Sequence, residues 1–182
     1  ANSLAVTAES FCYMPVYGLE ASATTLVGQS IGAGHSRLAV SFAWITTFMG
    51  MIMMSAMGVL MYFICPAVFV FLTPDIAVRE LGARVLRIEL LAEPFFGASI
   101  VAAGALRGAG DSQAPMFIML GSFVVFRQIY LFAAARLSGS VASIAFGYPA
   151  GWILCSVTMY LYYRSGRWEK YMVAARKDDT AI

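Results

Sequence analysis

Long apolar stretches separated by short polar loops constrain this chain more than any other feature. A helix that crosses the hydrocarbon core of a bilayer needs about 20 predominantly apolar residues. Five stretches meet that requirement, at residues 10–31, 39–72, 83–106, 116–135 and 141–163. The period-two alternation of membrane β-strands is absent from them. The pattern therefore predicts an all-α, polytopic transmembrane helix bundle over residues 1–164, followed by a basic tail at residues 165–182.

The composition favours the bilayer as solvent and argues against several other classes of protein. Of the 182 residues, 60% are hydrophobic and 12% are charged, and the net charge is +2. Soluble domains carry roughly 25% charged residues, so a core of this size cannot hide so much apolar surface. No basic stripe with interleaved aromatic residues indicates nucleic-acid binding. The three cysteines lack zinc-site spacing, and the single histidine, His35, lies in a glycine-rich loop. We therefore expect neither an enzyme nor a nucleic-acid-binding protein.

The placement of lysine and arginine predicts the orientation of the bundle. These residues are enriched in cytoplasmic loops and ends. Seven fall in the tail and in the loops predicted on its side, against two in the opposite loops: Arg37, Arg107, Arg164, Arg167, Lys170, Arg176 and Lys177 against Arg79 and Arg136. We therefore expect a cytoplasmic C-terminus in a bacterial-type plasma membrane. Because the chain begins at Ala1 with no signal-like segment, we expect it to be a piece of a longer polypeptide.

Three charged residues fall deep inside the predicted spans: Glu20, Glu93 and Arg127. A charge near the bilayer centre costs at least ~2.5–3.5 kcal/mol on insertion scales, so each is a candidate functional residue. They lie 11 to 13 residues from the predicted cytoplasmic ends of three different helices. At a rise of 1.5 Å per residue, all three are predicted ~17–20 Å from the cytoplasmic side, at one depth.

A fourth charge, Glu89, is predicted one helical turn from Glu93 on the same face. Two carboxylates this close cannot both ionise cheaply in a low dielectric. Such a pair can take up a proton, or lose both protons and hold Na⁺ with oxygen ligands. The adjacent Pro94 is expected to kink the helix and to free a backbone carbonyl beside the carboxylates. A structural ion pair between Arg127 and a glutamate, and a static kink, are the alternatives.

Two loop motifs bring a family into view. ATTLVGQSIGAGHSRLA at residues 23–39 and GALRGAGDSQAP at residues 104–115 resemble the signature repeats of the multidrug and toxic compound extrusion (MATE) family. Each joins a helix end to the next helix through a turn in which glycine stops the helix. The motif residues expected to matter structurally are Gln29, Gly32, Gly34, Arg107, Gly108, Gly110 and Asp111. The resemblance extends over about residues 9–172.

The resemblance implies one lobe, the second, of a two-lobed transporter with twelve helices. It also implies export of amphiphilic organic cations or other toxic compounds in exchange for Na⁺ or H⁺, with no cofactor beyond that ion. The expected partners are membrane lipid and the N-terminal lobe of the same transporter. Within this frame Glu93 is the predicted coupling carboxylate, Glu89 and Glu20 assist it, Arg127 is its electrostatic partner, and Na⁺ would bind at Glu93 and Glu89. The alternatives are an exporter of lipid-linked sugars with a related fold, which should have a more cationic core, and a membrane fragment that does not transport.

Overall fold

The computed structural model describes residues 2–72, 75–137 and 141–170, and among them the side chains of residues 13–70, 75–136 and 143–170. Every regular element in these ranges is helical, which confirms the predicted fold class. The elements are α1 (Asn2–Gly32), α2 (Ser36–Leu72), α3 (Ile76–Leu90), α4 (Glu93–Gly108), α5 (Gln113–Leu120), the π-helix η1 (Gly121–Phe126), α6 (Arg127–Leu137), α7 (Val141–Ala145) and α8 (Gly147–Arg164). The distal part of the predicted basic tail, residues 171–182, lies outside the described residues.

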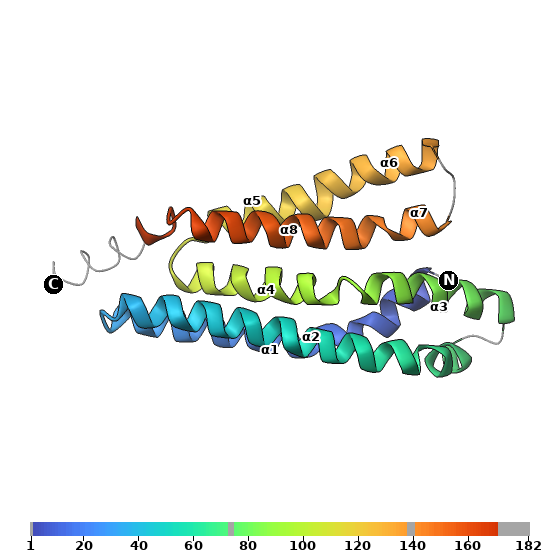
Figure 1. The fold of residues 1–182 in the computed structure, drawn as a ribbon, viewed down its shortest axis with the longest axis horizontal. Coiled ribbons are helices and arrows are strands. Elements are labelled where there is room, and N and C mark those ends of the chain that lie inside the picture. The colour runs from blue at the N-terminus through green and yellow to red at the C-terminus, as the bar shows by residue number, and fades with distance from the viewer. Residues whose placement is uncertain (1, 73–74, 138–140, 171–182) are drawn as a thin grey trace.

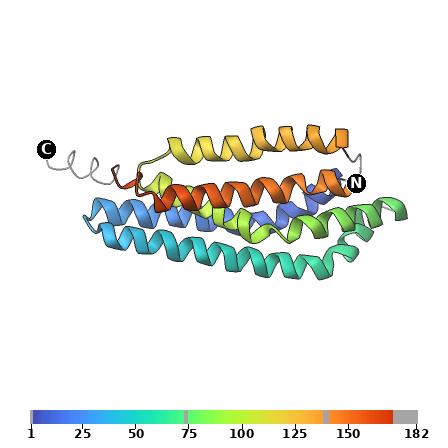
Figure 2. The same cartoon turned by 45° about the horizontal axis from the view of Figure 1, so that its top comes forward.

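The helices run roughly along one common axis, and α4 lies at the centre of the bundle (Figures 1 and 2). α4 packs against α1, α2 and α8. Its sequence suits this place, because a string of small residues from Gly97 to Ala105 lets three neighbours approach closely. Most of α4 is therefore buried, whereas α2 and the α5–α6 segment leave large apolar side chains exposed. That distribution is the one expected of a bundle surrounded by lipid.

Two of the five predicted spans are interrupted. The span predicted at residues 83–106 is divided at Leu91 and Ala92, where α3 ends and α4 begins. Proline at the second position of α4 explains the break, since Pro94 has no N–H for the preceding turn. The last span is divided at Phe146, three residues before Pro149. The kink predicted at Pro94 is therefore present, whereas Pro15 lies inside the continuous helix α1.

Within the described residues, three helical segments are long and apolar enough to cross a membrane: Ser36–Val70, Gln113–Arg136 and Ser143–Arg164. α1 is long enough but more polar, and the break leaves α3 and α4 with only 15 and 16 residues. All three are nevertheless aligned with the rest of the bundle (Figure 1). The number of five membrane spans therefore stays a prediction.

Both glycine-rich loops lie at one end of the bundle, together with the C-terminal end of α8 (Figure 1). Residues 33–35 join α1 to α2 there, and residues 109–112 join α4 to α5. The N-terminus lies toward the opposite end. Arg37 in the first turn of α2 and Arg107 in the last turn of α4 thus share an end with Arg164 and Arg167, as the distribution of basic residues predicted.

Candidate functional site: buried charges around the α3–α4 break

The two predicted coupling carboxylates lie on either side of the α3–α4 break. Glu89 is the penultimate residue of α3, and Glu93 is the first residue of α4. Their exposed fractions are 1% and 0%. The sequence predicted them one turn apart on a continuous helix, but two non-helical residues separate their helices. The break therefore sits between two buried acidic side chains, which is an uncommon and costly arrangement in an apolar bundle.

The backbone carbonyl of Leu90 lies next to the break. The carbonyl of Leu90 would normally accept a hydrogen bond from residue 94, and Pro94 has no N–H to donate. The same carbonyl faces α2, where a Cβ added to Gly58 would lie 3.2 Å from it and 3.5 Å from the Cβ of Glu93. Carboxylate and carbonyl oxygens are the ligands that hard cations prefer. We call Glu89, Leu90, Glu93 and the facing Gly58 the break site.

The third acidic residue, Glu20, is at a different level of the bundle. Its carboxylate forms a salt bridge with Arg107, 2.8 Å long, near the loop end of α4. The Glu20 backbone faces Gly104, which is 11 residues beyond Glu93 on α4. At 1.5 Å per residue that separation is ~17 Å. The prediction that Glu20 and Glu93 share one depth was therefore wrong. Counting residues from helix ends ignores how far α1 is offset from α4 along the bundle axis.

Close contact between α1 and α4 fixes the Glu20–Arg107 pair. The Thr24 hydroxyl donates hydrogen bonds to the carbonyls of Gly104 (2.9 Å) and Glu20 (3.0 Å). At Gly108 an added Cβ would overlap the backbone of Thr24. The Arg107 guanidinium also donates to the Ala103 carbonyl at 3.2 Å, so its head is held toward α1. Glycines spaced four residues apart thus bring α1 and α4 together, so that Arg107 reaches Glu20 across their contact.

The loop motifs close their helices as predicted. Gly32 and Gly108 are the last residues of α1 and α4. Gly34 and Gly110 follow with φ angles of 76° and 91°, in the left-handed region that favours glycine. Asp111 is buried behind the second turn, where it accepts a hydrogen bond from the Ala114 N–H at 3.2 Å and another from the hydroxyl of Tyr162.

Arg127 makes its contact with an aromatic ring of α8. Its guanidinium carbon is 3.5 Å from the centroid of the Tyr148 ring, a cation–π contact. Arg127 follows directly on η1, whose wider turns re-aim the residues after it. A cavity of about 340 Å³ surrounds the guanidinium and is lined by Tyr13, Tyr17, Phe96, Phe123, Arg127, Gly147, Tyr148, Gly151 and Trp152. The contact that the structure shows for Arg127 is thus an aromatic one, and its pairing with a glutamate stays a prediction.

The remaining predicted residues occupy simpler places. Gln29 is exposed near the end of α1, so it neither packs nor lines a described cavity. Within the part of the chain that the structure describes, no three His, Cys, Asp or Glu side chains gather as a metal site.

Sequence reasoning missed η1 and Tyr148. A glycine and serine at residues 121–122 inside an apolar helix were the one signal for η1, and nothing indicated the contact with Tyr148.

Buried acidic residues at a broken helix, a π-helical segment and long apolar helices are features of polytopic membrane transporters. The chain belongs to the MatE family, whose model matches residues 1–132. Proteins of this family are transporters rather than enzymes, which agrees with the absence of a catalytic motif from the sequence.

Known relatives support the assignment. The chain is 25% identical, over 97% of its length, to a probable multidrug resistance protein NorM of Thermotoga maritima, of which it covers 38%. It is 29% identical, over 94% of its length, to a protein of the same name from Brucella suis, of which it covers 37%. The chain therefore spans between a third and two fifths of the length of the curated relatives that it matches.

Proposed function

We propose that the protein containing this chain is an antiporter that exports organic cations in exchange for Na⁺ or H⁺, with Glu93 as the coupling carboxylate. The observation that carries the proposal is the complete burial of Glu93 and Glu89 on either side of a helix break. Two like charges in a low dielectric repel each other unless one is protonated or both share a cation. Binding of a proton or Na⁺ therefore has a strong reason to occur at this place.

The break gives ion binding a mechanical consequence. α3 and α4 meet without a continuous hydrogen-bond ladder, so their relative angle can change at Leu91 and Ala92 with little loss of backbone bonding. An ion that is bound in one packing and released in the other biases the equilibrium between the two. In the proposal, an empty break site favours the packing that binds the organic cation, and an occupied site favours the packing that releases it.

We further propose that the chain forms the second lobe and that the end with both glycine-rich loops faces the cytoplasm of a bacterium. The shared position of Arg37, Arg107, Arg164 and Arg167 at that end supports this orientation. The N-terminal lobe would then supply the other wall of the cavity for the organic cation. We propose that Glu20 does not bind the ion. It instead holds α1 against α4 through its contact with Arg107.

Ethidium efflux from cells that express the full-length protein tests the proposal. Wild type is compared with Glu93→Gln, while the Na⁺ gradient and the proton gradient are collapsed in turn. The matched control is Glu80→Gln, which removes an exposed carboxylate from α3, the helix that precedes the break. We expect efflux to require one of the two gradients, to fall by at least about tenfold in Glu93→Gln, the effect of 1.4 kcal/mol of lost ion binding, and to be unchanged in the control.

Other results would redirect the proposal. If Glu93→Gln reaches the membrane and pumps like wild type, Glu93 is not the coupling residue and Glu89 is the next to be replaced. If wild type moves no dye under either gradient, drug export is wrong and lipid-linked sugars become the cargo to test.

A further inference from the structure

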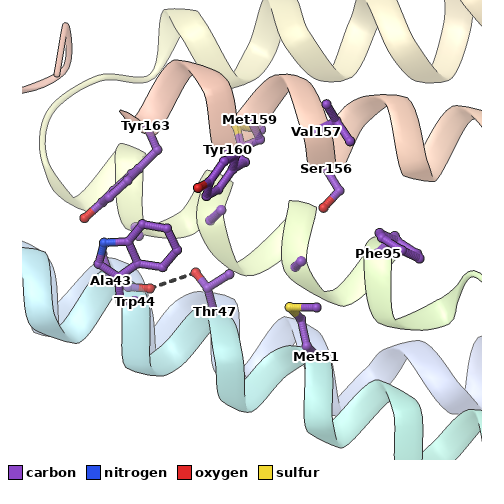
Figure 3. Close-up of a pocket in the computed structure, with 13 residues that line it drawn as sticks. Ala43, Trp44, Thr47, Met51, Phe95, Ser156, Val157, Met159, Tyr160 and Tyr163 are labelled. Atoms are coloured by element: carbon purple, nitrogen blue, oxygen red, sulfur yellow. Dashed lines mark hydrogen bonds between the residues drawn. The ribbon is translucent and has the colours of Figure 1, made fainter. Parts of the chain in front are cut away.

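A lateral groove runs between α2 and α8 and is floored by α4 (Figure 3). Its volume is about 250 Å³, and no charged side chain lines it. Small residues of α4 make the floor, and larger apolar or aromatic side chains of α2 and α8 make the walls. Val157 and Met51 lie along its length, and Phe95 lies at the end opposite Trp44 and Tyr163. The groove is thus a narrow apolar channel on the flank of the bundle.

Aromatic side chains close the end of the groove that lies nearest the glycine-rich loops. Trp44 packs edge-on against Tyr160 and Tyr163, with ring centroids 5.9 and 5.1 Å apart. The Tyr163 hydroxyl donates to the Val40 carbonyl at 3.4 Å and so ties α8 to α2 at this point. Tryptophan and tyrosine are enriched where the hydrocarbon of a membrane meets the headgroups. The closed end of the groove therefore has the chemistry of that boundary.

Two exposed arginines continue the walls of the groove beyond its aromatic end. Arg164 follows Tyr160 by four residues on α8, and Arg37 precedes Trp44 by seven residues on α2, so each lies on the groove face of its helix. Their distances along the helix axes are ~6 and ~10 Å. The salt bridge seen among the described side chains joins Arg107 to Glu20, so neither arginine is neutralised in this way. Arg167 adds a third positive charge and Glu169 one negative charge in the turn that follows.

We propose that this groove is a binding site for an anionic phospholipid of the surrounding membrane. One acyl chain lies on the small residues of α4, the ester region meets Trp44 and Tyr160, and the phosphate is held by Arg37 and Arg164. The order of apolar channel, aromatic boundary and basic residues matches the order of groups along a phospholipid. The lipid contacts α4, the helix that begins at Glu93, so it would brace the side of α4 that turns away from the Arg127 cavity. This site does not depend on the proposed antiport.

Lipid retention by the purified full-length protein tests the site. The protein is exchanged into mild detergent with equimolar phosphatidylglycerol and phosphatidylcholine, and bound lipids are counted by native mass spectrometry. Arg37→Gln/Arg164→Gln removes the two charges, and Ala102→Leu fills the floor. Arg84→Gln/Arg136→Gln and Ala133→Leu are matched changes at exposed positions outside the groove. We expect wild type and both controls to prefer phosphatidylglycerol. The double arginine variant should lose that preference by about twenty-five-fold, since each of the two basic residues near a membrane surface contributes about fivefold.

The same experiment separates the lipid from other occupants. In Ala102→Leu we expect fewer bound molecules of either lipid, with no change in the number retained by Ala133→Leu. Equal retention by wild type and both groove variants would overturn the proposal. A second measurement uses Val157→Cys, which places a thiol on the exposed rim of the groove. Labelling by a lipid-soluble maleimide supports access from the bilayer, whereas complete protection in delipidated protein means that another part of the polypeptide fills the groove, and the proposal fails.

Discussion

The break site and the Glu20–Arg107 pair place acidic residues in the same bundle in two different ways. Glu20 is partly exposed, with 17% of its side chain accessible, and its charge is matched by a guanidinium at 2.8 Å. Glu89 and Glu93 are wholly buried, and they bring two like charges to one helix break. The charge of Glu20 is thus already balanced by a side chain of the protein. The energy of two carboxylates buried at one break changes when a proton or cation binds, and for this reason we propose the break site, and not Glu20, for coupling.

The largest expected effect is that variants in the two regions change thermal stability and efflux in opposite ways. In Glu89→Gln/Glu93→Gln the like-charge repulsion is gone, so we expect equal or higher thermal stability of the purified full-length protein. Gradient-driven efflux should nevertheless fall by at least about tenfold, because no carboxylate remains to bind the ion. Glu20→Gln should show the reverse, with a lower Tm and efflux near wild type. Both quantities are measured on the same protein preparations, by unfolding in detergent and by dye efflux from vesicles.

A double variant that is strongly destabilised and inactive would break this comparison. In that case Glu89 and Glu93 would hold the bundle together through contacts of their own, and their burial would be structural.

The second effect concerns the close approach of α1 and α4, which the Glu20–Arg107 pair requires. Gly108→Ala places a Cβ against the backbone of Thr24, where no flexible side chain can move aside. Overpacking of this kind costs roughly 1–3 kcal/mol. Gly18→Ala is the matched control, since Gly18 lies within α1 with open space around it. The control should stabilise the helix by roughly 0.5–1 kcal/mol. Thermal unfolding of both variants in detergent provides the measurement, and equal Tm values would show that the approach of α1 and α4 relaxes easily.

The sequence predicted what depends on local chemistry. Long apolar stretches predicted the helices, because each must satisfy its own backbone in lipid. Pro94 predicted a kink at the place where the helix is broken, and Gly34 and Gly110 predicted the turns. These residues restrict or release the backbone regardless of their neighbours. Burial of Glu93 followed from its place within an apolar stretch. These features needed no knowledge of which helices touch.

What depends on packing register was beyond the sequence. The sliding of α1 along α4 decides that Glu20 meets Arg107 and lies ~17 Å from the level of Glu93. The π-helix η1 directly precedes Arg127, and the sequence does not indicate that Arg127 contacts Tyr148. Both depend on many small contacts between helices whose faces differ little in polarity, so hydrophobic periodicity carries almost no information about them.

A third effect tests the other side chain that ties elements together at the loop end. Asp111 accepts a hydrogen bond from the Ala114 N–H in the first turn of α5 and another from the Tyr162 hydroxyl of α8. Asp111→Ala removes both contacts, and we expect a loss of about 1–2 kcal/mol, the range for a helix cap and a hydrogen bond to a charged group. Tyr162→Phe should cost about 1 kcal/mol. The double variant should cost less than the sum of the two, because the second change removes a contact that is already lost. Strict additivity in thermal unfolding would mean that the two side chains do not interact in solution.

The smallest effect is expected for the charge interaction between Glu20 and Arg107 itself. Because 40% of the Arg107 side chain is exposed, solvent screens the pair, and exposed salt bridges contribute about 0–1 kcal/mol. A double-mutant cycle of Glu20→Gln and Arg107→Gln should therefore give a coupling energy at the low end of that range, falling further when salt is raised. The cycle is measured by thermal unfolding at two salt concentrations. A coupling energy of several kcal/mol that salt does not reduce would place the pair in a low dielectric, and the contrast between a screened pair and a buried ion site would then have to be abandoned.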